Sequence, residues 1–181
     1  MLLGLTLLYV GAVLILNGLW MLGRISDREI PVINLFSGGL TLLVALKLAL
    51  GDGADAVSIR NAAFSLLFSL TYLWVAYNRF SGADGRGLGW FSLFVAITAV
   101  PVAVDTLRAA AGPGEWWLGL SWAAWAVLWL LFFLLLALQR PIARLTATMS
   151  IVQGALTAWL PGYLLLTGAL LWFGVWHGIA A

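Results

Sequence analysis

Three tryptophans with helical spacing are the residues in this chain most suited to contacting a small ligand. Trp122, Trp125 and Trp129 lie three and four residues apart, so an α-helix would place them on one face. Indole is large and rigid, and its single N–H needs a partner where water is absent. The spacing predicts a surface that meets something other than acyl chains, with core packing as the alternative interpretation.

A second aromatic stripe precedes the tryptophans in the chain. Phe64, Phe68 and Tyr72 are spaced four residues apart, and Thr71 adjoins them. Aromatic stripes at helical spacing usually face a core, so the lining of a pore is the less frequent outcome. If this stripe lines a pore, it adds a phenol and a hydroxyl to the indoles.

A polar face recurs near the end of the chain. Thr146, Ser150, Gln153, Thr157 and Pro161 follow one another at offsets of four, three, four and four, which predicts one inward helix face. Since Pro161 has no N–H, the carbonyl of Thr157 needs another donor. Hydrogen bonding between helices and the lining of a pore explain this face equally well.

One buried amide and the absence of charges narrow the chemistry further. Asn17 must be satisfied either by a neighbouring helix or by a passing solute. No charged residue lies near the middle of an apolar segment; Lys47 and Asp105 are near ends, where Asp105 can pair with Arg108. A charge at the centre of a membrane helix costs about 2.5 to 3.5 kcal/mol and is usually kept for ion or proton transport. An uncharged lining instead suits a small neutral polar solute such as urea or an amide.

The elements that must position these residues are membrane helices. Hydrophobic residues make up 64% of the chain, charged residues 9%, and the mean hydropathy is +1.06. A bilayer core of about 30 Å needs about 20 apolar residues per helix. Apolar runs of this length predict an all-α integral membrane protein, a single domain of residues 1–181, with spans at about 2–22, 32–50, 62–80, 88–107, 116–138 and 143–172.

The basic residues predict the orientation of these spans. Six arginines fall in the first, third and fifth connections, against Lys47, Arg60 and Arg108 on the other side: Arg24, Arg28, Arg79, Arg86, Arg140 and Arg144. The positive-inside rule then places the odd connections in the cytoplasm and both termini outside. Tryptophans near span ends fit an interfacial belt: Trp90, Trp116, Trp117, Trp172 and Trp176.

Small residues predict where helices pack closely. Gly4, Gly11 and Gly18 recur every seven residues in the first span, which lets a neighbouring helix approach, and Gly38 and Gly39 suggest the same for the second. Three spans per half also leave room for two inverted three-helix repeats. A short echo between residues 70–72 and 156–158 is the sequence support for such a repeat.

Several function classes lose support at this point. The chain has no cysteine, its net charge is +2, and its basic residues form no patch, so nucleic-acid binding is not indicated. Paired carboxylates, a histidine-based metal site and a nucleophile beside a base are all missing from the spans, which argues against an enzyme and against a metal or cofactor. The connections are too short for a soluble catalytic domain.

Longer motifs along the whole chain add a resemblance. They are Leu7 to Gly11 with Asn17 and Gly18, Phe68 to Leu73, Gly89 to Val95, Trp122 to Trp129, and Leu156 to Pro161. Together they resemble the AmiS/UreI family of bacterial amide and urea channels. The resemblance implies a passive channel in the bacterial inner membrane and a ring-shaped homohexamer with one pore per protomer and lipid in the central hole. It also implies a link to a cytoplasmic amidase or urease.

Family positions carry over residue by residue. Phe68, Tyr72, Trp125 and Trp129 match the constriction aromatics, Trp117 and Trp122 match further pore-side tryptophans, and Asn17 matches the polar position of the first span. Together with Gln153 and Thr157 these form the expected pore.

Departures from the family pattern bear on gating. Acid-gated urea channels of the family carry a glutamate where this chain has Gln153, and have histidine-bearing outward loops, whereas the one histidine here is His177. We therefore expect no acid gating. Residues 84–90 look more like the amide-transporter branch, and urea and short aliphatic amides both remain candidates. A proton-coupled carrier using Asp105 or Glu115, and a structural or sensory protein without flux, are the alternatives.

Overall fold

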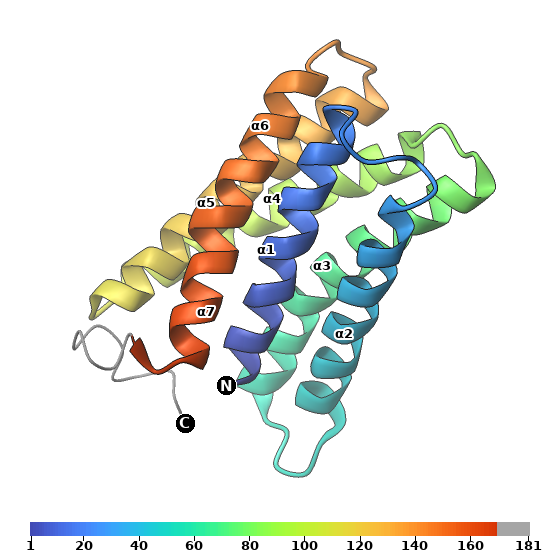
Figure 1. The fold of residues 1–181 in the computed structure, drawn as a ribbon. Coiled ribbons are helices and arrows are strands. Elements are labelled where there is room, and N and C mark those ends of the chain that lie inside the picture. Colours follow the sequence, from blue (N-terminus) through green and yellow to red (C-terminus); the bar gives the residue numbers. More distant parts are fainter. Residues whose placement is uncertain (170–181) are drawn as a thin grey trace.

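Six long apolar helices form a tilted bundle in the structure, a computed structural model that describes residues 1–169 (Figure 1). They are α1 (Leu2–Met21), α2 (Ile30–Leu50), α3 (Ala56–Ser81), α4 (Arg86–Ala109), α5 (Pro113–Phe132) with the π-helix η1 (Phe133–Ala137), and a sixth span of α6 (Ala143–Gln153), the π-helix η2 (Gly154–Trp159) and α7 (Leu160–Leu166). Each span has 20 to 26 residues, enough to cross a bilayer. The predicted all-α six-span membrane fold is confirmed.

Two helix ends lie six residues from the predicted spans, and the others lie within three. α3 begins at Ala56 rather than 62, because the Asp55 carboxylate accepts from the Ser58 N–H at 2.7 Å and caps a polar first turn. Hydrogen bonds from the backbone N–H and the hydroxyl of Ser58 hold the pKa of Asp55 below its usual value. The last span was predicted to reach 172, but α7 ends at Leu166, just before Gly168 adopts a φ of +72°. Residues 170–172 lie outside the described part.

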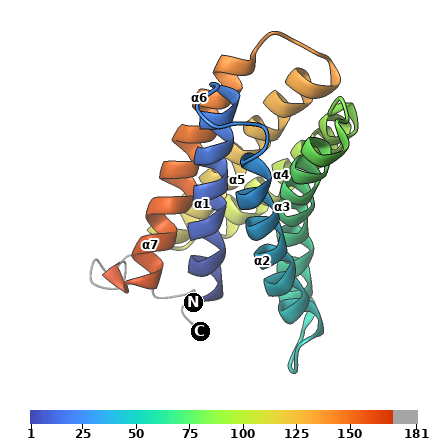
Figure 2. The same cartoon turned by 45° about the vertical axis from the view of Figure 1, so that its right-hand side comes forward.

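The six spans pack as three pairs. α2 packs along α3, α4 along α5, and α1 along α6, η2 and α7. Figures 1 and 2 show the N-terminus and the α2–α3 connection at one end of the bundle, with the α1–α2, α3–α4 and α5–α6 connections at the other. The odd connections thus share one end, which we call the arginine end. An inverted repeat of two three-helix halves stays a prediction, as does the side of the membrane that each end faces.

The glycine stripe of α1 is the surface that meets the sixth span. A Cβ at Gly11 would collide with the backbone of Trp159, and one at Gly18 would lie 2.7 Å from the carbonyl oxygen of Ala147. Close backbone approach is therefore possible only without side chains at these positions. The prediction that this stripe is a packing face is confirmed.

In α2 the two glycines behave differently. A Cβ at Gly38 would lie 2.8 Å from the Leu73 side chain of α3, whereas nothing lies within 4 Å of one at Gly39. The packing role predicted for Gly38 is confirmed, and that for Gly39 is wrong. The two residues are adjacent, so on a helix they point about 100° apart and cannot share one packing face.

Charged side chains gather at the arginine end. Among residues 1–169 the ion pairs are Asp27 with Arg79 at 3.7 Å and Asp84 with Arg86 at 3.4 Å. The ion pair predicted between Asp105 and Arg108 does not form. Both partners are exposed, and such a pair gains only about 0.2 to 0.5 kcal/mol.

The aromatic belt is partly visible. Trp90 and Trp116 are more than half exposed, as a position among lipid headgroups requires. Trp172 and Trp176 lie outside the described residues.

Candidate functional site

A cavity of about 40 Å³ lies between α1, α3, α4 and α5. It has room for roughly three water molecules. On α1 its wall runs from Leu14 to Trp20, and on α5 from Trp125 to Phe132. These are the last turns of both helices, so the cavity occupies the half of the bundle nearer the arginine end.

Four of the predicted pore residues meet around this cavity. Phe68, Tyr72, Trp125 and Trp129 all line it. The Phe68 ring lies 5.1 Å from the Trp125 ring, nearly perpendicular at 85°, and 4.7 Å from the Trp129 ring. Such edge-on packing is favourable between aromatic rings and leaves flat faces toward the space between them. The two stripes noted in the sequence thus pack against each other beside the same cavity.

Hydrogen bonds hold the two tryptophans in place. The Trp125 Nε1–H donates to Thr157 Oγ1 at 2.8 Å, and the Trp129 Nε1–H donates to Thr71 Oγ1 at 3.4 Å. Thr157 therefore reaches the site by holding Trp125 and is not itself among the residues that line the cavity. Thr71 lines the cavity, and the sequence noted it only as a neighbour of Tyr72.

The backbone around Thr157 is not α-helical. Residues Gly154 to Trp159 form the π-helix η2, in which the N–H of Leu160 donates to the carbonyl of Ala155, five residues back. π-helical turns are rare and frequent at functional sites. From the missing N–H of Pro161 the sequence predicted only that the carbonyl of Thr157 needs another donor, and the structure places a wider turn just before this proline.

Trp122 and Trp117, predicted as pore-side residues, lie beyond the cavity. The Trp122 ring packs against Phe64 at 5.7 Å and Trp125 at 5.3 Å without lining the cavity. Trp117 is half-buried and packs against the same core. Both support the aromatic cluster from the side of the N-terminus.

Asn17 is satisfied by a neighbouring helix and also borders the cavity. Its amide forms reciprocal hydrogen bonds with the Asn34 amide of α2, at 3.1 Å and 2.7 Å, and Asn34 also donates to the carbonyl of Ile30 at 3.0 Å. Asn17 also lines the cavity. The sequence analysis missed Asn34, although a second amide in an apolar span was a visible signal for a buried partner.

Gln153 is not among the residues that line the cavity, and its place in the pore stays a prediction. It is buried, and its Oε1 has no hydrogen-bond partner among the described residues. Its neighbour on the same face, Ser150, donates to the carbonyl of Leu14 at 2.7 Å. Ser150 therefore turns toward α1, which the glycine stripe brings close, whereas Thr157 of the same span turns toward Trp125 of α5.

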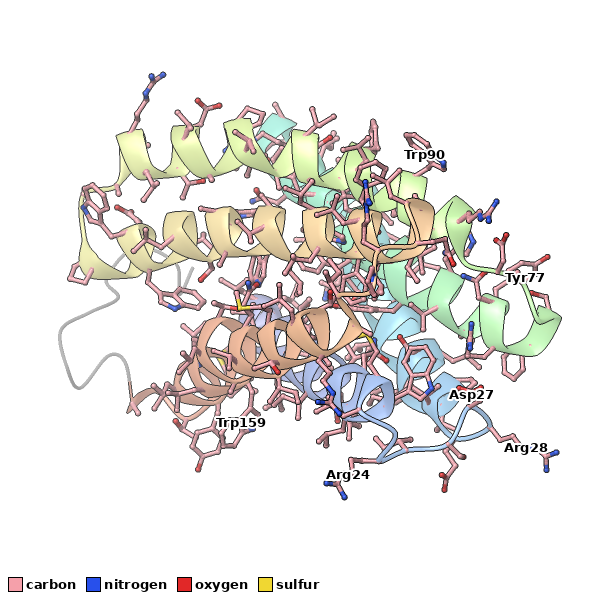
Figure 3. All side chains as sticks on the ribbon, turned by 90° about the horizontal axis from the view of Figure 1, so that it is seen from above. Arg24, Asp27, Arg28, Tyr77, Trp90 and Trp159 are labelled. Carbon is pink, nitrogen blue, oxygen red and sulfur yellow. The ribbon has the colours of Figure 1, made fainter. Side chains whose placement is uncertain are left out.

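The arginine end of the cavity is bordered by a network that the sequence did not reveal. Trp20 lines the cavity and donates from Nε1 to Asp27 Oδ1 at 2.6 Å. The guanidinium of Arg79 on α3 lies 5.1 Å from the centre of the Trp20 ring and pairs with Asp27. Figure 3 shows Asp27 on the α1–α2 connection, where Arg24 and Arg28 point away from the bundle.

The electrostatics of the cavity are those of a neutral site. No charged side chain lines it, and among residues 1–169 no group of three metal-ligating side chains occurs. An ion would lose its hydration here without compensation, whereas a small uncharged polar molecule loses much less. Flat aromatic walls with a few hydroxyl and amide groups suit a flat neutral solute.

Comparisons with known proteins point the same way. Residues 2–169 match the sequence model of the AmiS/UreI family of transporters. A protein of Mycolicibacterium smegmatis named for the transport of amidate substrates is 44% identical over 166 residues, 91% of this chain and 76% of that protein. The acid-activated urea channel of Helicobacter pylori is 36% identical over 189 aligned residues, 90% of this chain and 96% of that channel. The cryoEM structure of the H. pylori urea channel in a closed state matches with a TM-score of 0.83 at 37% identity, covering 92% of this chain and 98% of that one.

Proposed function

Because the chain belongs to the AmiS/UreI transporter family, we propose that it is a passive channel for small uncharged amides, including urea and short aliphatic amides. The observation that carries the proposal is the uncharged cavity between Phe68, Tyr72, Trp125 and Trp129. Its rings offer flat faces to a planar solute, and its hydroxyl and amide groups replace part of the solute's water. The names of the relatives supply the chemical class of that solute.

Passive permeation is favoured over proton coupling by the positions of the acidic residues. Asp105 is exposed on α4. The carboxylate of Glu115 accepts hydrogen bonds from the N–H groups of Ala111 and Gly112 at the start of α5. Neither residue lines the cavity, and Glu115 is occupied in capping a helix. A carrier that couples flux to protons needs an acidic or basic group along the solute path.

We further propose that the channel is not acid-gated. The support is Gln153, an amide that does not titrate, together with short connections that hold no histidine among residues 1–169. The pKa of Asp55 is lowered, so this carboxylate keeps its charge at acidic pH. The helix cap that it forms is lost only when the pH falls below the ordinary pKa of an aspartate, about 4. Flux should therefore change little between pH 5 and 7.5.

The family membership also supports a homohexamer in the bacterial inner membrane, with one pore per protomer and lipid in the central hole. The distribution of arginines favours a cytoplasmic arginine end and outward termini. A functional link to a cytoplasmic amidase or urease completes the proposal, because a channel supplies such an enzyme with substrate. An amidase or urease gene next to the gene for this chain would support that link.

Flux in proteoliposomes tests the function directly. Urea and acetamide should enter liposomes that contain the purified protein much faster than they enter empty liposomes, at similar rates with and without an uncoupler. Flux equal to that of empty liposomes would refute the channel and favour a structural or sensory role. Accumulation that collapses with the uncoupler would favour the coupled carrier, and Asp105→Asn would then test the coupling residue.

A further inference from the structure

Most hydrogen-bond donors beside the cavity are already used inside the protein. Indole has one N–H, and those of Trp125 and Trp129 are both donated to threonine hydroxyls, at 2.8 Å and 3.4 Å. Neither tryptophan therefore offers a donor to a solute. Each contributes only the face and edge of its ring.

The direction of these hydrogen bonds is set by the threonines. Thr157 donates its hydroxyl hydrogen to the carbonyl of Gln153 at 2.6 Å, and Thr71 donates to the carbonyl of Leu67 at 2.7 Å. A hydroxyl has a single hydrogen, so each Oγ1 can only accept further bonds. Each threonine can therefore accept from an indole N–H but cannot donate to a second acceptor.

The two restraints act from different helices. Trp125 is tied to η2 in the sixth span, and Trp129, one turn further along α5, is tied to α3. Phe68 contacts both rings from α3. The orientation of the cavity wall is therefore fixed from two sides, and neither indole can rotate its N–H into the cavity without leaving its partner.

The remaining polar groups of the cavity are richer in acceptors than in donors. Ser92 also spends its hydrogen within the protein, on the carbonyl of Leu88 at 2.8 Å. The Tyr72 hydroxyl makes no hydrogen bond to any of residues 1–169, and the Asn17 amide keeps one N–H beyond its bond to Asn34. Free acceptor positions remain on Thr71, Ser92, Asn17 and Tyr72. The free donors are two, the Tyr72 hydroxyl and one N–H of Asn17.

We infer that Thr71 and Thr157 are positioning residues for selectivity. By accepting both indole N–H groups, they leave a cavity with excess acceptors, which prefers solutes that carry NH2 groups over solutes of equal size with fewer N–H groups. This inference rests on the proposed function and specifies the chemistry that the pore selects. Urea, with four N–H hydrogens and one carbonyl, fits such a lining.

Two isomers allow a test with solutes of identical composition. Acetamide has two N–H hydrogens and N-methylformamide has one. Their fluxes are measured in proteoliposomes, each corrected for empty liposomes. For the unaltered protein we expect acetamide to be favoured. Thr157→Val keeps the branched shape but frees the Trp125 N–H, and should lower the acetamide preference about threefold to tenfold, the range for one hydrogen bond.

Matched variants separate positioning from general damage. Thr157→Ser keeps the acceptor and should restore most of the preference that the valine variant loses. Thr148→Val removes an exposed hydroxyl of the same span that also donates to a carbonyl four residues back, and should leave the preference unchanged. Thr71→Val and Thr71→Ser repeat the comparison for Trp129, and serve alone if Thr157→Val does not fold.

A readout without transport tests the hydrogen bond itself. With ¹⁵N-labelled tryptophan, Trp125→Phe assigns the Trp125 indole signal, and Thr157→Val should move that signal while Thr148→Val leaves it in place. If both solutes cross and the Thr157→Val and Thr148→Val preferences are equal, the inference is wrong and the channel stands. If neither solute crosses faster than in empty liposomes, the proposed function itself fails.

Discussion

Two helix interfaces in this bundle are built from opposite residue types. Where α1 meets the sixth span, glycines bring the backbones together, and a Cβ at Gly11 would strike the backbone of Trp159. Where α3 faces α5, large rings such as Phe68 and Trp129 meet at 4.7 Å and hold the helices apart. A cavity lies beside the second interface. Small residues remove space between helices, whereas rigid rings that cannot interdigitate leave some.

The polar groups of the glycine interface and of the aromatic interface also differ in what they bind. In the glycine interface, Ser150 donates directly to the Leu14 carbonyl of α1. In the aromatic interface, the hydroxyls of Thr71 and Thr157 act as acceptors for indoles that border the cavity. The first arrangement ties a side chain to the backbone of the neighbouring helix, and the second orients aromatic side chains. We therefore expect substitutions in the first to affect folding and substitutions in the second to affect selectivity.

The largest effect should come from filling the glycine interface. Gly11→Leu forces α1 away from η2, because backbone atoms cannot yield as a flexible side chain can, and should destabilise the protein by more than about 3 kcal/mol. The measurement is the thermal midpoint and the yield of monodisperse protein in detergent. Gly39→Leu is the control, since nothing lies within 4 Å of a Cβ there. Equal thermal midpoints for the two variants would contradict the close approach.

Opening the aromatic interface should come next. Trp129→Ala or Trp125→Ala enlarges the cavity, and the flux ratio of urea to a larger amide such as butyramide should fall by about tenfold, the value of 1 to 2 kcal/mol of lost discrimination. Trp90→Ala removes an indole that is 57% exposed outside the cavity and should leave the ratio unchanged. Matching ratios for the cavity variants and Trp90→Ala would remove the stripe from the mechanism.

A smaller effect is expected at the amide pair between α1 and α2. Asn34→Leu leaves the Asn17 amide without its partner and should cost about 1 to 3 kcal/mol in thermal stability. The double variant Asn17→Leu, Asn34→Leu removes both partners and should recover most of that loss. A double variant less stable than Asn34→Leu would show that the amide pair has another role.

The smallest effect should appear at the arginine end. Asp27→Asn keeps an acceptor for Trp20 but removes the charge opposite Arg79, and Asp27 is 72% exposed. Exposed ion pairs contribute at most about 1 kcal/mol, so the thermal midpoint should hardly move, and urea flux should change less than twofold. Asp27→Ala, which also removes the acceptor, should alter flux more. An equal result for the two variants would mean that the hydrogen bond to Trp20 does not shape this end of the cavity.

Much of the fold could be predicted because it depends on local patterns. Runs of apolar residues are sufficient to predict six membrane helices, and the seven-residue recurrence of Gly4, Gly11 and Gly18 predicts a close contact. The spacing of Phe68 and Tyr72 correctly indicated rings on one face of α3, and that of Trp125 and Trp129 indicated rings on one face of α5. Helix ends were less accurate, because the cap at Asp55 and the left-handed Gly168 act through single residues that hydropathy does not weigh.

The partners of these residues could not be predicted, since they lie on different helices. Ser150 shared a predicted inward face with Gln153 and Thr157, yet it donates to the Leu14 carbonyl of α1, which lies close because of its glycines. Trp20 looked like an ordinary residue at a span end, and it borders the cavity because Asp27 and Arg79 hold it there.

The sequence by itself determined that this chain spans a membrane six times and that its interior is aromatic and uncharged, because hydropathy and helical spacing are properties of consecutive residues. Only the tertiary structure decided which polar groups reach the cavity and which are spent elsewhere. Thr71 and Thr157 look alike in the sequence as hydroxyls in apolar spans. Their function depends on an indole 58 residues away for Thr71 and 32 for Thr157, a relation set by helix packing.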